Sequence, residues 1–571
     1  MKAADKLKIN VSGKPSVCLI AAGLLVAVFL CFGQVRTFGF VDYDDRDYVV
    51  ANPHLGAGTV VERVTWAFTA FHAANWHPVT WLSFIADHAL FDLDPAWYHT
   101  ENLVFHGLNA VLLLALLVRL TGSVGKSALV AALFALHPLR AESVAWVTER
   151  KGLLMAFFCL LTLLAYVSHA RRPSRGGMLA VTVLFAVAVL SKPQAVVLPL
   201  VLLLCDWWPL GRVRPESSPA AWRSSLLEKL PLLLLSAAVI PLVVAAQRRG
   251  GAVAPFDALA IGPRLACAVV APIAYLGKTI RPFGLSPAYP FTQPAAWQVV
   301  GATLILGTLT IGAVRRRATH PWFVTGWLGF LALLAPVSSL FQVGGQALAD
   351  RYTYLPHIPL FMAAVWSGAN ALHHRPAPQR ATAAVVALLL LPILGFIAHR
   401  QTTVWRDDLA LFSHAVSVTA GNWKMHYNLA NTFERNGRDT DAERQYLLAL
   451  EARPAYPEAL NNLGALHGRR GEAEIALAMF TRAVSINPGY GPGWFNLGSQ
   501  RERGGDLPGA LAAFRTATLL QPDAAGPRVR LGKVLLGLAR RDEALAPCRE
   551  ALRIEPGSAA AAACVEEASS P

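Results

Sequence analysis

The sequence predicts an all-α protein with two parts, a polytopic helical membrane domain followed by a solenoid of paired helices. Apolar runs of membrane-spanning length recur before residue 400. Only 15% of the 571 residues are charged, against about 25% in a typical soluble protein. After residue 400 the apolar runs stop and a 34-residue repeat begins. We therefore expect a membrane domain over 1–400 and a repeat domain over 401–571.

The composition narrows the class of partner. The net charge of +15 does not require a nucleic acid, because much of the basic excess lies in short loops between apolar runs. Basic loops of this kind set the orientation of membrane spans. The seven cysteines include no CxxC pair and no zinc-ligand spacing, and Cys548 and Cys564 can pair only if the fold happens to bring them together. We expect a lipid bilayer, and no nucleic acid, among the partners.

The chain begins with a basic segment and an apolar run. Four lysines precede the run at about 17–35, namely Lys2, Lys6, Lys8 and Lys14. A signal peptide is the alternative, but its apolar region would be unusually long and no clear small-residue cleavage site follows. We predict an uncleaved first span with the N-terminus in the cytoplasm.

An acidic stretch follows the first span. The residues FVDYDDRDYVVAN (40–52) contain Asp42, Asp44, Asp45 and Asp47. Carboxylates at a membrane surface can bind a hard cation or take a proton from a nucleophile, and the alternative is a solvated acidic turn. The first extracytoplasmic loop, 36–98, is too polar to cross and is rich in Trp and Phe, so we expect helices that lie along the outer surface.

Eleven crossings fit the pattern of apolar runs and basic loops. After the first span they lie at about 102–120, 127–138, 152–168, two short spans that flank 191–193, 226–245, 298–314, 322–341, 355–372 and 381–398. The run at 265–280 is ambiguous, because a crossing there would place the basic residues of 315–317 and Arg375 and Arg380 outside. We predict that this run is re-entrant or lies along the surface. The C-terminal repeats then share the outer face with the aspartates.

The repeats have the tetratricopeptide pattern. Asparagine, alanine and proline each recur every 34 residues, as at Asn428, Asn462 and Asn496. A small residue lies where paired helices touch, an aromatic residue packs the pair, and a proline ends the second helix. We predict four repeats at about 423–456, 457–490, 491–524 and 525–558. Stacked helix pairs form a surface suited to an extended peptide, and a rigid spacer or a dimer contact is the alternative.

Four polar groups fall on the outer face under this topology. They are the acidic stretch, NWHPVTWLS with its continuation to residue 106, HPLRAESVAWVTERK and ALADRYTYLP, and Lys192 can join them. Taken singly, each has a structural interpretation as a core histidine, a snorkelling arginine or a cation that balances the aspartates. Their common face favours a functional cavity. The candidate residues are Asp42, Asp44, Asp45, His77, His99, His137, Glu142, Arg150, Lys151, Lys192, Arg351 and Tyr352.

This set of side chains suits one kind of chemistry. Cations can neutralise a phosphate leaving group while a carboxylate deprotonates an acceptor hydroxyl. A cavity that opens at the outer leaflet indicates a lipid-phosphate donor.

The order of the blocks resembles one protein family. An Asp-Asp pair after one span, HP…AESVAW…RKGLL, SKP, DRYTYLP and trailing tetratricopeptide repeats occur in this order over nearly the whole chain. Together they resemble the transmembrane and tetratricopeptide-repeat O-mannosyltransferases and their bacterial relatives. The resemblance implies a GT-C membrane fold and transfer of a sugar from a polyprenyl-phosphate carrier to Ser or Thr hydroxyls on the non-cytoplasmic side.

The resemblance also implies roles for single residues. Asp44 and Asp45 match the acidic pair, so one of them would act as general base or as ligand of a divalent metal, Mg or Mn. Arg150, Lys192 and Arg351 are assigned to the donor phosphate as a hypothesis. The sequence departs from the family pattern after Arg150 and after Lys192, where relatives often carry an acidic residue and this chain has Lys151 and Pro193. These departures bear on metal dependence and on the identity of the sugar.

The predicted function is therefore that of a glycosyltransferase of the bacterial inner membrane. Its donor would be a polyprenyl-phosphate-linked sugar, and its acceptor a periplasmic protein or peptide held at the groove of the repeats. One alternative is a glycosyltransferase with a lipid or polysaccharide acceptor. Another is a non-enzymatic membrane scaffold for envelope assembly, for which Asp44→Asn should leave partner binding intact. A transporter would predict internal symmetry of the spans, which we do not find in the sequence.

Overall fold

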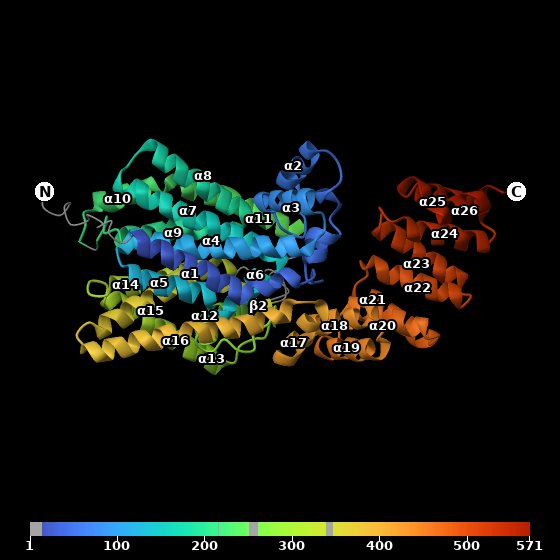
Figure 1. Cartoon of the computed structure of the whole chain (residues 1–571). Helices are drawn as coiled ribbons and strands as arrows, with labels where there is room; N and C mark the ends of the chain where they lie inside the picture. Colours follow the sequence, from blue (N-terminus) through green and yellow to red (C-terminus); the bar gives the residue numbers. More distant parts are fainter. Residues whose placement is uncertain (1–13, 215, 250–260, 339–345, 571) are drawn as a thin grey trace. The chain divides into compact units, whose positions relative to one another are not determined.

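A computed structural model describes residues 14–214, 216–249, 261–338 and 346–570 (Figure 1). The N-terminal lysines Lys2, Lys6 and Lys8 lie outside the described residues. The chain forms two compact units, Met1–Thr419 and Ala420–Pro571. The described part is helical apart from one two-stranded antiparallel ribbon of β1 (Tyr289–Pro290) and β2 (Gln346–Leu348). The all-α prediction is therefore confirmed.

The first unit contains a bundle of long apolar helices. Six helices in the described ranges are long and apolar enough to cross a membrane, or seven if one bent pair is a single span. The six are α1 (Lys14–Phe32), α4 (Pro95–Thr121), α7 (Arg150–Arg171), α11 (Leu230–Arg249), α13 (Ala296–Arg315) and α16 (Ala377–Thr402). The bent pair joins α5 (Val124–Leu136) to η5 (Pro138–Arg140) and α6 (Ala141–Ala145) at an angle of 58°. The chain is a multi-pass membrane protein.

Shorter helices occupy the remaining predicted spans. They are α8 (Arg175–Ser191), η7 (Pro193–Val197) with α9 (Leu198–Trp207), α14 (Pro321–Leu334) with η8 (Ala335–Val337), and α15 (His357–Leu372). The predicted number of crossings, eleven, stays a prediction. A further helix of 20 residues is α12 (Ile261–Ile280). The remaining segments are short, namely α10 (Pro219–Glu228), η10 (Asp350–Thr353), η11 (Thr403–Trp405) and α17 (Asp408–Val418).

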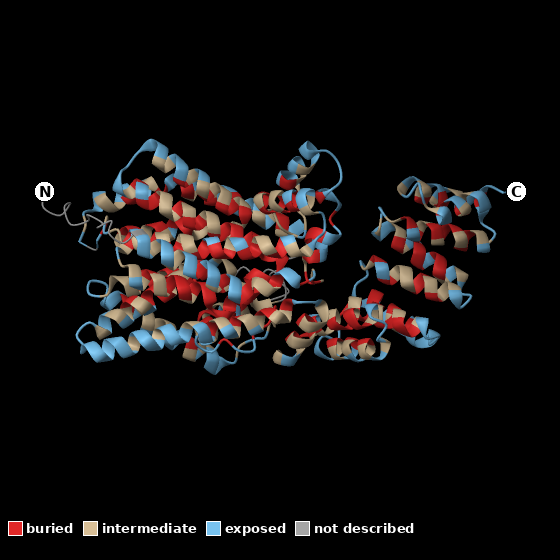
Figure 2. Cartoon of the chain, in the orientation of Figure 1, coloured by how far each residue is buried: buried red, intermediate tan, exposed pale blue. Residues whose placement is uncertain are grey.

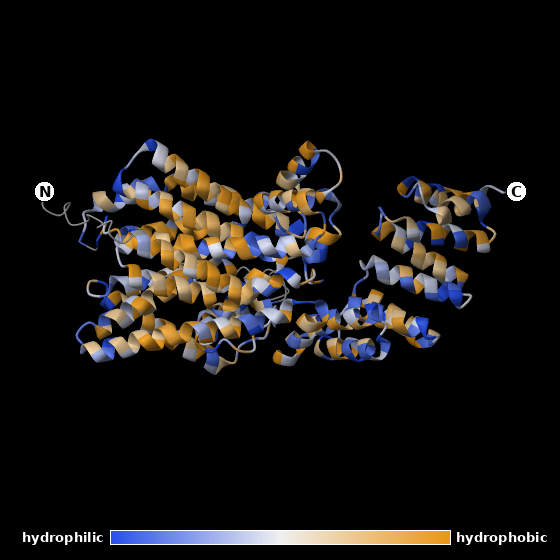
Figure 3. Cartoon of the chain, in the orientation of Figure 1, coloured by the Kyte–Doolittle hydropathy of each residue, from blue (hydrophilic) through white to orange (hydrophobic). Residues whose placement is uncertain are grey.

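The surface of the bundle is apolar. Val385, Leu388, Ile393 and Phe396 of α16 are all exposed, and Figures 2 and 3 show this helix as both exposed and hydrophobic. In water such a patch would be unusually large, whereas lipid tails cover it without cost. The interior is packed by α1, α4 and α7, which run side by side (Figure 1).

The loop between α1 and α4 is folded. It contains η2 (Gly33–Thr37), η3 (Arg46–Val50), η4 (Pro53–Leu55), α2 (Val60–Thr69) and α3 (Pro78–Phe91). Thr59 and Glu62 form a capping box at the start of α2, which satisfies backbone donors that the first turn leaves unpaired. Tyr48, Trp81 and Phe84 are buried in a core that this loop shares with Val147. The predicted helices in this loop are present.

The ambiguous run at 265–280 is part of α12. Sγ of Cys267, near its start, lies 3.7 Å from the carbonyl oxygen of Thr292. At its other end the Thr279 carbonyl oxygen lies 3.0 Å from Nε2 of His137. The prediction that this run lies along the surface stays a prediction.

The second unit is a solenoid of helix pairs. The pairs are α18 (Trp423–Arg435) with α19 (Asp439–Ala452), α20 (Pro457–Arg469) with α21 (Ala473–Ile486), α22 (Gly491–Arg503) with α23 (Leu507–Leu520), and α24 (Ala525–Gly537) with α25 (Arg541–Ile554). A further helix, α26 (Ala559–Ser569), follows the last pair. A Cβ atom added to Gly464 would lie 2.9 Å from the ring of Phe480, and Gly498 meets Phe514 at the same distance. The close approach explains the 34-residue spacing of small and aromatic residues.

The boundary between the units differs from the predicted one. We predicted the change at residue 400, whereas the structure groups α17 with the membrane unit. His414 Nε2 lies 2.9 Å from the carbonyl oxygen of Leu285, and Asp408 accepts a hydrogen bond of 2.6 Å from the backbone N–H of Asp42. These contacts hold α17 in the first unit.

Candidate functional site

Charged side chains from four parts of the chain meet at one end of the helix bundle. Asp44 comes from the first loop, Glu142 from α6, and Lys192 from the junction of α8 and η7. Glu149 ends η6 (Val147–Glu149), Lys151 lies in the first turn of α7 and Arg351 lies in η10. We call these six residues the charged cluster. It contains Asp44, Glu142, Lys151, Lys192 and Arg351 from the predicted set, and adds Glu149.

A line of ion pairs runs through the charged cluster. Lys192 pairs with Glu149, whose other carboxylate oxygen lies 3.8 Å from Nε of Arg351. Arg351 pairs in turn with Glu142 through its guanidinium, and its backbone N–H donates to Oε2 of Glu142 at 2.7 Å. The side chains of Lys192 and Arg351 are only 15% and 10% exposed. Buried charges of this kind are tolerated because they are paired.

Aromatic rings support the cations. Nζ of Lys151 lies 4.5 Å from the ring centre of Tyr48 and 5.4 Å from that of Trp146. The guanidinium of Arg351 lies 5.1 Å from the rings of both Trp146 and Tyr352. Tyr352 is held by a hydrogen bond of 3.1 Å that its hydroxyl accepts from Gln346. Ring faces attract cations, so Trp146 separates and orients the two basic side chains.

Asp44 and Asp45 occupy different environments. Asp45 is fully buried, and its carboxylate accepts hydrogen bonds from the backbone N–H of Val41 (3.1 Å), and from the backbone N–H (3.0 Å) and hydroxyl (2.5 Å) of Thr148. Burial raises the pKa of Asp45 to about 7, against the lowering effect of these donors. Both oxygens are therefore engaged in tying the first loop to η6.

Asp44, by contrast, is only partly buried. The pKa of Tyr48 is raised mainly by burial, and the negative charge of Asp44 raises it further. Lys151 interacts electrostatically with Asp44 and donates a hydrogen bond of 3.3 Å to the Tyr48 hydroxyl. Of the adjacent pair, Asp44 is the carboxylate placed among the cations. The side chain of Asp42 is also partly buried, and its backbone N–H is bound to Asp408.

Arg150 lies in a separate buried network. Its side chain is fully buried and donates to Asn102 (2.5 Å), Ser83 (2.8 Å), Asp87 (3.1 Å), Glu101 and the Tyr98 carbonyl oxygen (2.8 Å). These contacts join α3, α4 and α7. The structure therefore gives Arg150 a role in holding the first loop, and its assignment to a donor phosphate stays a prediction.

Three predicted histidines are packed in the core. His77 is stacked on Tyr48 at 5.6 Å, and burial, followed by the charges of Lys151 and Lys192, holds its pKa well below 6.5. His99 lies with Nε2 3.2 Å from the Gly39 carbonyl oxygen. Nδ1 of His137 accepts from the backbone N–H of Leu139 at the start of η5. His77 lies beside the charged cluster as a neutral ring, and the other two fix backbone turns.

A second carboxylate group lies next to the charged cluster. Asp350 is buried, accepts hydrogen bonds of 2.9 and 3.0 Å from the Tyr289 hydroxyl, and lies 4.0 Å from Nζ of Lys278. Burial raises the pKa of Asp350 to about 6, and the Lys278 charge opposes this. Glu142 and Asp350 both line a very small pocket.

Sequence reasoning missed Glu149, Lys278 and Tyr289. Lys278 had a usable signal, because it is the single charge between Arg264 and Arg281 in an apolar run, and charges in such runs are functional candidates. Glu149 stood in a polar block and could not be distinguished from its neighbours. Tyr289 had no signal, because only the fold brings it to Asp350.

The predicted metal ligands differ in how far their oxygens are engaged. Asp45 would have to give up its hydrogen bonds from Val41 and Thr148 to share an ion with Asp44. Within the described ranges no three His, Cys, Asp or Glu side chains are placed to hold an ion together. A divalent metal at Asp44 and Asp45 stays a prediction.

An apolar pocket lies inside the bundle. It is lined by α4, α7, α9, α14 and α15, with almost only aliphatic side chains. Cys159 of its wall is nine residues from Arg150, or about 14 Å along α7. Leu198 and Leu355 of the wall follow Lys192 and Arg351 closely in the sequence. The pocket thus lies within the bundle, a short way along the helices from the charged cluster.

The chain is similar to curated protein O-mannosyl-transferases. It is 26% identical to the human protein O-mannosyl-transferase TMTC1 over 80% of this chain and 58% of that protein. The Caenorhabditis elegans protein O-mannosyl-transferase F38B6.6 is 25% identical over 77% of this chain and 63% of its own length. Human TMTC4 is 25% identical over 73% and 64%. This chain spans about three fifths of the length of these relatives.

Other comparisons add little. No family model matches the chain. A solved structure, "YrrB: a TPR protein with an unusual peptide-binding site", is 22% identical over 28% of this chain and 81% of its own length, with a TM-score of 0.25. The helix pairs and their 34-residue period identify the repeats.

Proposed function

We propose that the protein is a membrane glycosyltransferase that moves a sugar from a polyprenyl-phosphate donor to Ser or Thr hydroxyls of extracytoplasmic proteins. The observation that carries the proposal is the grouping of Lys151, Lys192 and Arg351 with Glu142 and Glu149, where Asp44 interacts electrostatically with Lys151, in a bundle that also holds an apolar pocket. Similarity to protein O-mannosyl-transferases over most of the chain supports the same activity. A scaffold protein would have no use for this convergence of charges.

The two halves of the site match the two halves of the donor. The aliphatic wall of the pocket suits a prenyl chain, because each buried methylene contributes about 0.8 kcal/mol. The basic side chains of the charged cluster suit the phosphate at the end of that chain. A donor with both parts explains why the pocket and the charged cluster lie close together in one bundle.

The reaction would be a direct displacement. The acceptor oxygen bonds to the anomeric carbon while the bond from that carbon to the phosphate oxygen breaks, and the phosphate leaves with the bonding electrons. Asp44 takes the proton of the acceptor hydroxyl. Lys151, Lys192 and Arg351 neutralise the charge that develops on the leaving phosphate. Asp45 and Arg150 hold the first loop so that Asp44 stays in place.

The repeats would bind the acceptor. Paired helices present side chains along a continuous face, which suits an extended peptide. We propose that the N-terminus is cytoplasmic and that the charged cluster and the repeats face the periplasm of a bacterium. The acceptor then reaches both on the same side of the membrane.

Glycoproteomics of membrane and envelope proteins tests the proposal. Cells would carry the wild type, Asp44→Asn, no copy, or the control Asp47→Asn, which changes an exposed carboxylate three residues away. We expect a hexose increment on Ser or Thr peptides in the wild type and in the control, and its loss in Asp44→Asn. Unchanged glycopeptides in the deletion strain would overturn the proposed activity.

A further inference from the structure

The last repeat replaces an aromatic residue by a cysteine. Tyr446, Phe480 and Phe514 are 34 residues apart, and the next position in this register is Cys548. In the second and third repeats the ring packs against a glycine of the preceding helix, Gly464 and Gly498. A single thiol is much smaller than a ring, so Cys548 alone would leave a void in the last pair.

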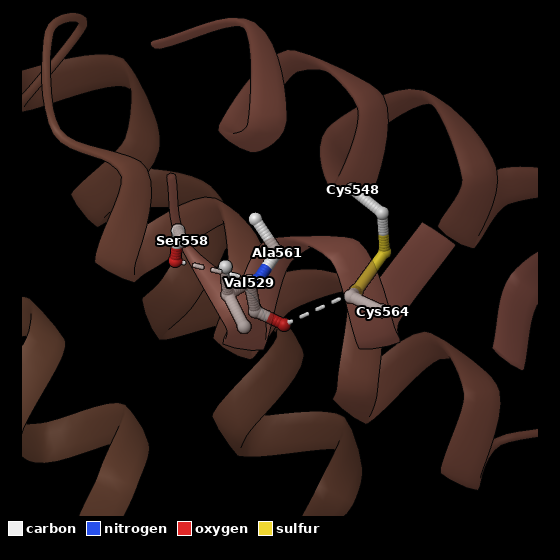
Figure 4. Close-up of a disulfide and its surroundings, with 5 residues drawn as sticks. All are labelled: Val529, Cys548, Ser558, Ala561 and Cys564. Carbon is white, nitrogen blue, oxygen red and sulfur yellow. Dashed lines mark hydrogen bonds between the residues drawn. A yellow bond between two sulfur atoms is a disulfide. The ribbon is translucent and has the colours of Figure 1, made fainter. Parts of the chain in front are cut away.

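The void is filled from the helix that follows the repeats. Cys564 of α26 is bonded to Cys548 of α25 in the structure (Figure 4), and both are fully buried. A Cβ atom added to Gly532, the equivalent of Gly464, would lie 2.3 Å from Sγ of Cys548 and 2.6 Å from Sγ of Cys564. The two sulfurs therefore occupy the place that a ring occupies in the earlier repeats.

The helix that supplies Cys564 is short, and small side chains make most of its packing against the last repeat. Its eleven residues, AAAAACVEEAS, bury only Ala561, Cys564 and Ala568. Helices of this length are marginal in water unless a packed face holds them, and alanine buries little apolar area. Ser558 caps its start by accepting the backbone N–H of Ala561 at 3.4 Å. The cross-link is the strongest tie between α26 and the last repeat.

We propose that Cys548 and Cys564 are a covalent modification site, where the disulfide of an exported protein oxidises the two thiols. The resulting bond between them fixes α26 to the end of the repeat unit. The step is thiol–disulfide exchange. Two thiols lose two protons and two electrons, the bond between the sulfurs forms, and the donor's disulfide is reduced to two thiols. Such donors act in oxidising compartments and not in a reducing cytosol. The proposal rests on the outward location of the repeats and not on the sugar-transfer chemistry.

The full chain in intact cells provides the first test. An alkylating reagent is added to living cells before lysis, and the non-reduced protein is digested with trypsin. We expect peptide 542–549 linked to peptide 554–571, with separation only after reduction. Alkylation of both cysteines in untreated cells would overturn the proposal.

A control variant, Asn436→Cys, distinguishes a missing cross-link from a wrong location of the repeats. Asn436 is exposed, and an impermeant reagent reaches it in intact cells only if the repeats are outside. If Asn436→Cys is labelled in intact cells but Cys548 and Cys564 are free thiols, only the proposed cross-link is overturned. If Asn436→Cys is not labelled, the repeats are not outside, and the proposed location of the acceptor site is overturned as well.

A pair of variants tests the replacement of the ring. Cys548→Phe with Cys564→Ala restores the aromatic residue beside Gly532, whereas Cys548→Ala with Cys564→Ala leaves the void. Both variants lose the cross-link. We expect the second to lower the Tm by roughly 10 °C and the first to lower it by less, because the ring fills the void. Limited proteolysis reports whether α26 is released. Equal loss in both variants would show that the sulfurs do not substitute for a ring, and unchanged Tm in the second would contradict the need for the cross-link.

Discussion

Asp44 and Asp45 are neighbours in the chain, yet their surroundings assign them different tasks. Asp45 has its oxygens filled by donors from Val41 and Thr148 and holds a loop. Asp44 is partly exposed and interacts with Lys151. The sequence predicted the acidic pair but could not separate its members, because the difference arises from Thr148, about one hundred residues away in the chain.

The role of Asp45 can be tested by stability. Asp45→Ala leaves the buried N–H groups of Val41 and Thr148 without an acceptor, which costs roughly 1–3 kcal/mol for each group. We expect a Tm of the purified protein several degrees below that of the wild type. Asp44→Asn should leave the Tm unchanged, and a loss in Asp44→Asn equal to that in Asp45→Ala would contradict the division of tasks.

His77 predicts a dependence of stability on pH. Burial holds its pKa in the folded protein well below 6.5. The unfolded chain therefore takes up a proton as the pH falls below about 6.5 while the folded chain does not, so stability decreases in that range. His77→Phe keeps the stacking with Tyr48 and Trp81 and removes the titration. Thermal melts at several pH values should show a smaller loss for His77→Phe between pH 6.5 and 5, and parallel curves would contradict the assignment.

The start of α7 shows how an element shapes the site. Glu149 folds over the first turn of this helix, and a Cβ atom added to Gly152 would lie 2.2 Å from its carboxylate oxygen. The position of Glu149 between Lys192 and Arg351 thus depends on a residue without a side chain. The positive end of the helix dipole also favours a carboxylate there.

Gly152→Ala should disturb the charged cluster through this contact. Displacement of Glu149 breaks its pair with Lys192, so we expect at least a tenfold loss of sugar transfer in an assay with membranes. Gly301→Ala in α13 is a matched control, because no atom lies within 4 Å of the added carbon. That variant should retain full transfer and gain up to about 1 kcal/mol of stability. Normal transfer by Gly152→Ala would show that Glu149 is not needed where it lies.

Helices with a clear hydrophobic or repeat pattern could be predicted from the sequence. Roles of side chains that depend on contacts between distant parts of the chain could not. The apolar run 17–35 became α1, and the 34-residue period became four helix pairs. Arg150 was placed at the donor phosphate by its block, but contacts with Asp87 and Asn102 hold it in the core. Neither partner has a recognisable spacing from Arg150, so only the packing of α3 and α4 against α7 identifies its role.

At the scale of the whole molecule the orientation in the membrane is the main consequence to check. Basic loops predict that Arg171 and Arg316 face the cytoplasm. Single cysteines at these two positions, in a chain in which Cys18 is replaced by Ser, should resist an impermeant thiol reagent until the membrane is opened. Asn436→Cys should react in intact cells. Labelling of Arg316→Cys in intact cells would show that α12 crosses the membrane.

The balance of charge in the site also has a kinetic consequence. The charged cluster has three basic side chains, Lys151, Lys192 and Arg351, and three acidic ones, Asp44, Glu142 and Glu149. It therefore carries no net charge when all six are ionised. A phosphate must compete with the two glutamates for the same cations. If the leaving group is the proposed lipid phosphate, the glutamates would compete with it for the same cations after transfer. The ion pairs of the resting protein would then oppose retention of that product.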